Sequence, residues 1–95
     1  MGKKLVKIKK IILPTLKKHD VVKASLFGSL VRGEDTASSD IDLLVQFKRG
    51  KSLLDLIGLE LALKDQLNRD VDVLTYNSLN HLIRERVLKE QVQIL

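Results

Sequence analysis

Two apolar patterns alternate along the chain, and their order limits the architectures that the chain can adopt. Segments rich in β-branched residues, which favour strands, cover residues 21–27, 41–47 and 71–75. Apolar residues recur at helical spacing over residues 3–18, 52–67 and 78–93, and a short helical turn is expected over residues 29–33. This alternation predicts an α+β (α/β layered) domain, in which helices cover a small mixed sheet of about three strands.

Local signals refine the helices. Ser29 is placed as the N-cap of the short turn, and Ser52 followed by Asp55 is typical of a helix start. Pro14 removes a backbone donor inside residues 3–18, so this helix either kinks there or gives way to a second short helix. The apolar residues of the last helix are predicted to point inward: Leu79, Leu82, Ile83 and Val87.

The size and composition of the chain limit the kinds of protein that it can be. The 95 residues are expected to form a single domain over residues 1–95. With no cysteine, disulfides and thiolate zinc sites are excluded, which fits a cytoplasmic protein. No apolar run approaches the ~18 residues of a membrane span. Lysines also interrupt the first helix, so we expect no signal peptide.

The formal net charge of +5 favours an anionic partner: a nucleotide, a nucleic acid or an acidic protein. Nucleic acid is the less favoured of these, because no aromatic residue is interleaved with the lysines of the first helix. Those lysines fit a solvated face instead. His19 and His81 have no partner pattern for a metal, and Tyr76 is expected to pack at a strand end.

Gly28 and Ser29 lie where the first predicted strand runs into the helical turn. Backbone amides at such a turn lack helical partners, and the helix dipole favours an anion there. Glycine lets a phosphate approach the backbone, and the Ser29 hydroxyl offers another donor. Arg32, one turn on, either meets a phosphate oxygen or pairs on the surface with Glu34 or Asp35.

Asp40 and Asp42 are separated by one residue at the start of the second predicted strand. Alternation puts both carboxylates on one face, where their repulsion favours a cation between them. Magnesium prefers hard oxygen ligands and shares its coordination shell with substrate phosphates. Two ions about 3.5–4 Å apart would stabilise the attacking and leaving oxygens of a phosphoryl displacement. The third predicted strand supplies another carboxylate on one face, from either Asp70 or Asp72.

Together these residues resemble the minimal nucleotidyltransferases of the DNA polymerase β superfamily. The pattern of that family is Gly-Ser, two residues, Arg-Gly, a short loop, and Ser-Asp-x-Asp followed by apolar residues. The matching positions are Gly28, Ser29, Arg32, Gly33, Ser39, Asp40 and Asp42. The resemblance extends over essentially the whole chain and implies a polymerase β-like fold. It assigns the third carboxylate to Asp72, although Asn68-Arg69-Asp70 replaces the family's usual Gly-Arg pair before that strand.

The resemblance implies that Asp40, Asp42 and Asp72 bind Mg²⁺ and perform catalysis. It also implies that the matching residues from Gly28 to Ser39 bind ATP. Such proteins are often antitoxins encoded with a HEPN-domain toxin, and some transfer AMP from ATP onto a tyrosine of that partner. We therefore expect metal-dependent AMP transfer to a protein hydroxyl. The alternative is a binding module that neutralises its partner by contact alone.

Overall fold

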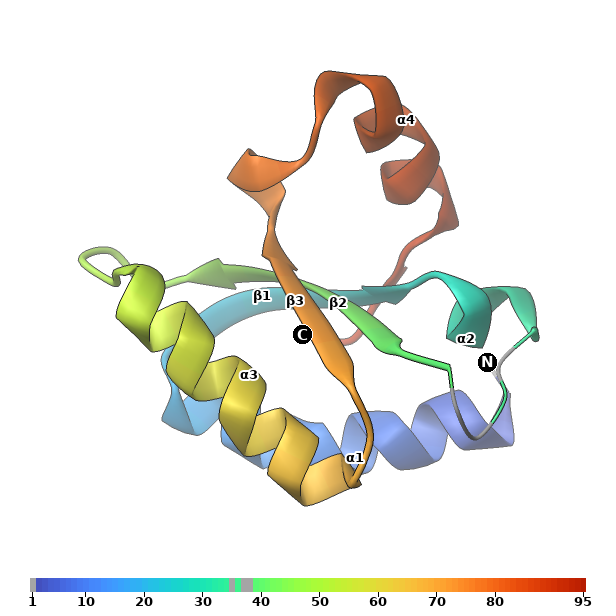
Figure 1. Ribbon diagram of the computed structural model, residues 1–95, viewed down its shortest axis with the longest axis horizontal. Coiled ribbons are helices and arrows are strands. Elements are labelled where there is room, and N and C mark those ends of the chain that lie inside the picture. Colours follow the sequence, from blue (N-terminus) through green and yellow to red (C-terminus); the bar gives the residue numbers. More distant parts are fainter. Residues whose placement is uncertain (1, 35, 37–38) are drawn as a thin grey trace.

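The computed structural model describes residues 2–34, 36 and 39–95, which form a four-stranded sheet with helices on both faces (Figure 1). This confirms the α+β class, with one strand more than the sequence predicts. The elements are α1 (Lys3–Lys18), β1 (Val21–Phe27), α2 (Ser29–Arg32), β2 (Ile41–Phe47), α3 (Leu53–Leu67), β3 (Val71–Thr75), the 3-10 turn η1 (Tyr76–Ser78), α4 (His81–Glu90) and β4 (Val92–Gln93).

The sheet is mixed and has the strand order β3-β2-β1-β4. β1 pairs antiparallel with both β2 and β4, whereas β2 and β3 run parallel. The parallel pair follows from α3, which serves as the crossover connection that parallel strands need. As a result the N-terminal ends of β2 and β3 lie next to each other, and the acidic residues that begin both strands meet there.

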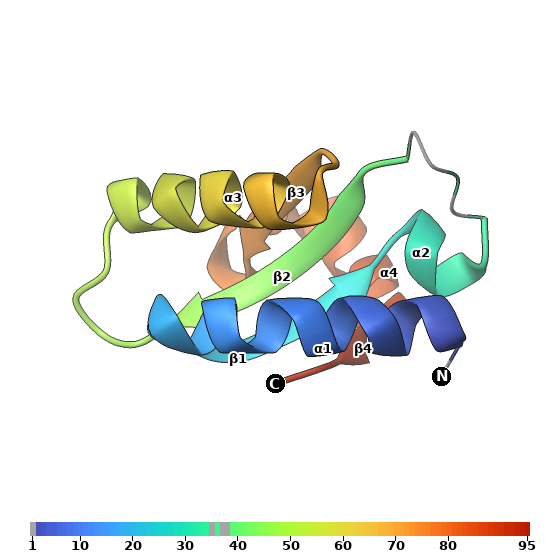
Figure 2. The ribbon, with the colours of Figure 1, turned by 90° about the horizontal axis from the view of Figure 1, so that it is seen from below.

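The first face of the sheet carries the main core. α1 and α3 lie side by side against this face (Figure 2). Fully buried side chains from every layer fill the space between helices and sheet: Ile12, Leu16, Leu26, Ile41, Leu43, Val45, Leu59 and Leu63. This core of aliphatic side chains matches a sequence that has only three aromatic residues.

Pro14 neither ends nor splits the first helix. α1 runs from Lys3 to Lys18 with Pro14 inside it. Near the proline, the Gln66 amide of α3 donates a 2.9 Å hydrogen bond to the carbonyl of Ile11. The same amide accepts a 2.7 Å hydrogen bond from the Thr15 hydroxyl. Gln66 therefore ties α1 to α3 next to the proline.

The second face of the sheet is covered by η1 and α4, which pack on Leu44 around Leu79 and Val87. Ser25, buried in β1, forms a 2.8 Å hydroxyl–hydroxyl hydrogen bond with Tyr76. This confirms that Tyr76 packs at a strand end.

The last helix differs from its prediction. It begins at His81 rather than Ser78, because Asn80 is the N-cap and its side chain accepts a 2.8 Å hydrogen bond from the Leu82 amide. It ends at Glu90, and the chain then joins the sheet as β4. Leu82 and Ile83 are 83% and 47% exposed, so the prediction that they point inward is wrong, although it holds for Leu79 and Val87.

In the part of the chain described above, no helix combines the length and apolar character that crossing a membrane requires.

Candidate functional site

The turn between β1 and α2 depends on the backbone of Gly28. This residue adopts φ +80° and ψ −152°, a region that is essentially restricted to glycine. Its carbonyl accepts hydrogen bonds from the amides of Val31 and Arg32, both at 3.1 Å. Gly28 is therefore the N-cap of α2, and the prediction that Ser29 caps this helix is wrong. Ser29 is already the first helical residue, so its hydroxyl does not cap the helix.

The absence of a side chain at Gly28 brings a carboxylate against this turn. A Cβ added to Gly28 would overlap the Oδ2 of Asp42 and lie 3.0 Å from its Cγ. The strand register explains the approach, because Asp42 pairs with Phe27, the residue before Gly28. The amide-rich turn and one carboxylate of the Asp-x-Asp pair are thus in direct contact.

The parallel register of β2 and β3 places the other carboxylates. Asp42 is the register partner of Asp72, and the amide of Ile41 donates a 2.9 Å hydrogen bond to the carbonyl of Asp70. Burial, together with the negative charges of Asp72 and Asp40, raises the pKa of Asp42 to about 6. Asp72 and Asp40 therefore act electrostatically on Asp42, as expected for carboxylates that lie near one another at the start of β2 and β3.

Within the described residues, no group of three or more His, Cys, Asp or Glu side chains is arranged to hold a metal ion by itself. This is compatible with magnesium, which is usually bound through one or two carboxylates, with phosphate and water oxygens completing its octahedron. The donor chemistry also fits, because the carboxylates are hard oxygen ligands and the negative charge around Asp42 favours a cation. Magnesium binding by Asp40, Asp42 and Asp72 stays a prediction.

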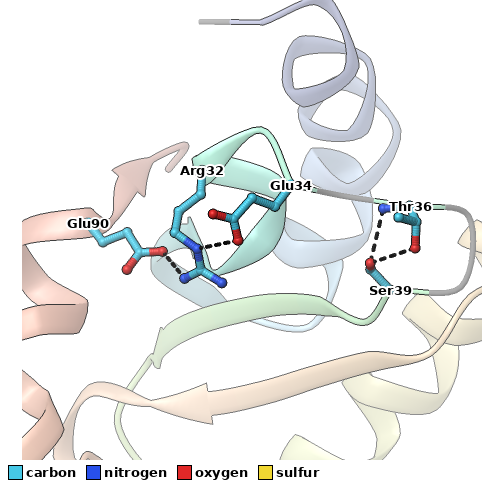
Figure 3. A network of polar contacts seen from close by, with 5 residues as sticks. All are labelled: Arg32, Glu34, Thr36, Ser39 and Glu90. Carbon is cyan, nitrogen blue, oxygen red and sulfur yellow. Dashed lines mark hydrogen bonds and ion pairs between the residues drawn. The ribbon is translucent and has the colours of Figure 1, made fainter.

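Arg32 lies between two carboxylates at the end of α2 (Figure 3). Its Nε donates to Glu34 at 3.1 Å, and its Nη1 donates to Glu90 at 2.6 Å. These hydrogen bonds raise the pKa of Arg32, Glu34 being the larger cause. The predicted ion pair with Glu34 is confirmed, while Asp35, the alternative partner, lies outside the described residues. The phosphate-binding role of Arg32 stays a prediction.

Ser39 closes a tight turn directly before Asp40 (Figure 3). Its Oγ accepts a 3.0 Å hydrogen bond from the Thr36 amide, and its own amide donates to the Thr36 carbonyl at 3.1 Å. Arg69 binds the same two residues, since its Nη2 donates to the carbonyls of Thr36 at 3.0 Å and Ser39 at 2.5 Å. The described contacts give Ser39 a structural role, and its contact with nucleotide stays a prediction.

The sequence alone assigns no role to two residues of the site, Arg69 and Glu90. Arg69 follows Asn68, which ends α3 in the left-handed conformation with φ +53°. Asparagine tolerates that conformation, so Asn68-Arg69 can replace the family's Gly-Arg pair. The position of Arg69 just before the third-carboxylate strand is the signal that could have indicated its role. Glu90 lies 58 residues from Arg32 in the sequence, and no local pattern indicates their pairing.

A comparison with protein families matches residues 7–95 of this chain to the family described as polymerase beta, nucleotidyltransferase. The chain belongs to this nucleotidyltransferase family. The resemblance inferred from the sequence and the expectation of a polymerase β-like fold are therefore confirmed.

Two relatives in the family are named for protein adenylylation. A Methanocaldococcus jannaschii protein named as a candidate protein adenylyltransferase is 52% identical over 88 residues, which cover 93% of this chain and 95% of that one. The protein adenylyltransferase MntA of Thermococcus cleftensis is 44% identical over 69 residues, which cover 73% of this chain and 70% of that one. This chain is thus similar over most of its length to nucleotidyltransferases of small size.

Solved structures agree with this assignment. A structure described as a minimal nucleotidyltransferase superimposes with a TM-score of 0.81 at 38% identity, covering 95% of this chain and 92% of that chain. The antitoxin in a complex with a tri-AMPylated Shewanella oneidensis HEPN toxin superimposes with a TM-score of 0.74, covering 95% of this chain and 71% of that chain. At 21% identity, this second likeness shows the fold alone.

Proposed function

We propose that this nucleotidyltransferase transfers AMP from ATP to a hydroxyl group of a partner protein, in a reaction that requires Mg²⁺. The observation that carries the proposal is the contact between the Gly28 turn and the carboxylate of Asp42, with Asp72 paired beside it on β3. A turn suited to phosphate and an acidic edge suited to magnesium are thereby adjacent. The names of the two adenylyltransferase relatives support the choice of AMP as the transferred group.

In this proposal each residue group has one task. The backbone at Gly28 and Ser29 receives the phosphates of ATP, since amides at the start of a helix favour anions. Asp40 and Asp42 hold Mg²⁺, which neutralises charge on the phosphate oxygens when bound. Asp72 faces the same side of the sheet as Asp42 and is exposed, so an incoming hydroxyl can reach it.

The transfer is a displacement at the α-phosphorus of ATP. The acceptor oxygen forms a bond to this phosphorus while the bond to the bridging oxygen of the β-phosphate breaks, and pyrophosphate leaves. The acceptor proton passes to Asp72, which acts as general base. Catalysis then rests on positioning and on stabilisation of charge.

The proposed partner is a HEPN-domain toxin, which adenylylation would inactivate. Support comes from the tri-AMPylated HEPN toxin seen with the antitoxin of the same fold. The same likeness leaves open an antitoxin that neutralises by contact alone, so the decisive experiment separates transfer from binding.

That experiment uses Asp72→Asn. We expect this variant to bind Mg-ATP with nearly native affinity in calorimetric titration, because Asp40 and Asp42 remain. Transfer of radiolabelled AMP to a co-expressed HEPN partner should fall by about 10²–10⁴-fold, the typical cost of losing a positioned general base. The control is Asp70→Asn, two residues earlier and directly before β3.

Rescue of cells from the partner completes the test. An Asp72→Asn variant without transferase activity should not rescue cells if neutralisation is enzymatic. Full rescue by this variant would assign the protein to contact neutralisation instead. If Asp72→Asn transfers AMP normally while Asp70→Asn does not, the third-carboxylate role belongs to Asp70.

A further inference from the structure

α3 is apolar on two opposite sides, and the described residues cover only one of them. Leu59 and Leu63 are fully buried against the sheet and α1. On the opposite side, Leu54, Ile57 and Leu61 recur at helical spacing and are 78%, 44% and 60% exposed. We call Leu54, Ile57, Gly58 and Leu61 the α3 outer stripe. A surface helix normally has a polar outer face, and a helix that is apolar all round is normally buried on both sides. The outer stripe therefore has the character of a contact surface.

Gly58 lies in the middle of this stripe, and the fold itself gives no reason for a glycine there. Apart from its chain neighbours and the backbone of its own helix, no heavy atom of the described residues lies within 4 Å of the position that a Gly58 Cβ would occupy. Glycine inside a helix costs about 0.5–1 kcal/mol relative to alanine. A helix that crosses α3 closely at this point would explain the glycine, because the axes of packed helices lie roughly 8–10 Å apart and small contacting side chains allow the shorter distances.

The stripe and its flanking charges are self-complementary. The midpoint of the stripe lies between Ile57 and Gly58, so an antiparallel copy of α3 places Leu54 opposite Leu61 of the second copy. The same operation brings Asp65 towards the turn that precedes α3, which carries Arg49 and Lys51. Arg49 and Asp65 are both exposed, and within the described part of the chain neither forms an ion pair. Lys51 is already paired with Asp20 at 2.7 Å, which leaves Arg49 as the cation for Asp65.

From these observations we propose that the α3 outer stripe is a two-fold interface with a second copy of this chain, in which antiparallel α3 helices cross at Gly58. In such an isologous contact the two Leu54–Leu61 pairs and the two Arg49–Asp65 pairs form together. One helix pair buries less than the roughly 800 Å² per partner of a standard interface, so the dimer is weak and depends on concentration. α3 lies on the opposite face of the sheet from Asp42 and Asp72. The candidate site of each copy therefore stays open in the dimer.

The first experiment is sedimentation velocity of the full chain from about 1 µM to about 500 µM, a range that spans weak association. The average mass of the native chain should rise from monomer towards dimer. Leu61→Glu should stay monomeric throughout, because it places a charge in the apolar contact. Leu82→Glu is the matched control, since Leu82 is also exposed, at 83% against 60% for Leu61, but lies on α4. A native chain that stays monomeric, or a Leu61→Glu variant that dimerises normally, would contradict the proposal.

Gly58→Leu separates an interface from a merely structural role. Leucine favours the helix, and its Cβ has open space at this position, so the melting temperature measured at low concentration should rise. Dimerisation should weaken by about 10-fold or more, since the leucine keeps the helices apart. Normal dimerisation of this variant would overturn the crossing at Gly58.

Charge reversal tests the orientation of the two helices. Arg49→Glu and Asp65→Arg should each weaken association by about 3- to 10-fold at low salt, and the double variant should recover it. A double variant no better than either single one would contradict the antiparallel pairing. If the native chain is monomeric and Leu61→Glu abolishes binding of the HEPN partner instead, the stripe belongs to that partner and the proposal is wrong.

Discussion

Gly28 shows how one residue type is required for two independent physical reasons. Its backbone has φ +80° and ψ −152°, which side-chain-bearing residues rarely adopt. Its missing Cβ also leaves the space that the Oδ2 of Asp42 occupies. A substitution must therefore either change the turn or displace the carboxylate, and both changes disrupt the candidate site.

Gly28→Ala tests this requirement. We expect the variant to lose about 1–3 kcal/mol of folding free energy, the usual range for a strained backbone position, as measured by thermal unfolding. Mg-ATP binding, measured by calorimetry below the unfolding transition, should become undetectable. Gly50→Asn is the control, because Gly50 also has a positive φ, +90°, has open space around it and lies outside the candidate site. Native affinity in a folded Gly28→Ala protein would remove Gly28 from the phosphate site.

The carboxylates show what a sequence can and cannot predict at this scale. Asp40 and Asp42 stand out because a compound motif surrounds them. Spacing alone leaves Asp70 and Asp72 as alternatives, since strand alternation puts both on the same face. The structure places Asp72 beside Asp42 through the parallel register, which depends on how α3 returns the chain to the sheet. No local sequence pattern encodes this register between β2 and β3.

At the scale of elements, Arg69 connects the end of α3 to the turn before β2. Its guanidinium binds the carbonyls of Thr36 and Ser39, which lie on either side of that turn. Asp40 follows directly, so Arg69 restrains the backbone that carries a predicted magnesium ligand. Asn68 supplies the left-handed helix end that directs the chain into β3.

Arg69→Met keeps the aliphatic stem and removes the donors. Because the turn loses these hydrogen bonds, we expect Mg-ATP affinity to fall by about 3- to 10-fold, while the folding free energy falls by about 1–2 kcal/mol. Calorimetric titration and chemical denaturation measure the two effects. Arg84→Met on α4 is the control, because Arg84 is exposed and distant in sequence from the turn. An Arg69→Met variant with native affinity would show that the turn does not control Asp40.

The elements that sequence reasoning missed are those fixed by long-range contacts. The three long strands and the helices α1 and α3 follow from periodicity and from the Ser52–Asp55 capping box, which the structure contains. β4 was missed because two residues carry no periodic signal, and pairing with Ser25 and Leu26 of β1 creates the strand. The outward positions of Leu82 and Ile83 were missed because α4 begins only at His81. Buried Leu79 therefore lies before the helix, and the helical spacing assumed from Leu79 to Leu82 and Ile83 does not exist.

The whole molecule divides its sheet between stability and function. One face packs against α1 and α3 through an aliphatic core, whereas the other carries the candidate site and only the smaller cluster beneath α4. Carboxylates placed together on that second face oppose folding in the absence of a cation, which is a common cost of a functional site. The free energy of unfolding should therefore record this repulsion.

The raised pKa of Asp42 determines whether this carboxylate makes the protein more or less stable to unfolding as pH rises. The folded protein, with a pKa of about 6 at Asp42, holds this proton more tightly than the unfolded chain, where the value is near 3.8. In the metal-free protein, the stabilisation that comes from this more tightly held proton is fully present below about pH 4. It is lost as pH rises through about 6. Asp20 and Asp55 contribute with the opposite sign, because ion pairing or hydrogen bonding lowers their pKa values.

Asp42→Asn isolates the contribution of this carboxylate to stability. The contributions of the other titratable groups cancel when the variant is compared with the native chain. In EDTA, we expect the two proteins to unfold alike near pH 4, while at pH 8 the variant is more stable by about 1 kcal/mol, a value reduced for the partial exposure of Asp42. For a domain of this size, that difference raises the melting temperature by about 4–8 °C. Adding Mg²⁺ at pH 8 should stabilise the native protein more than the variant, because the cation relieves the repulsion only where the carboxylate is present. Glu85→Gln, an exposed charge change on α4, should alter neither difference. A variant that is no more stable than the native chain at pH 8 would show that the ionised Asp42 carboxylate does not destabilise the folded protein.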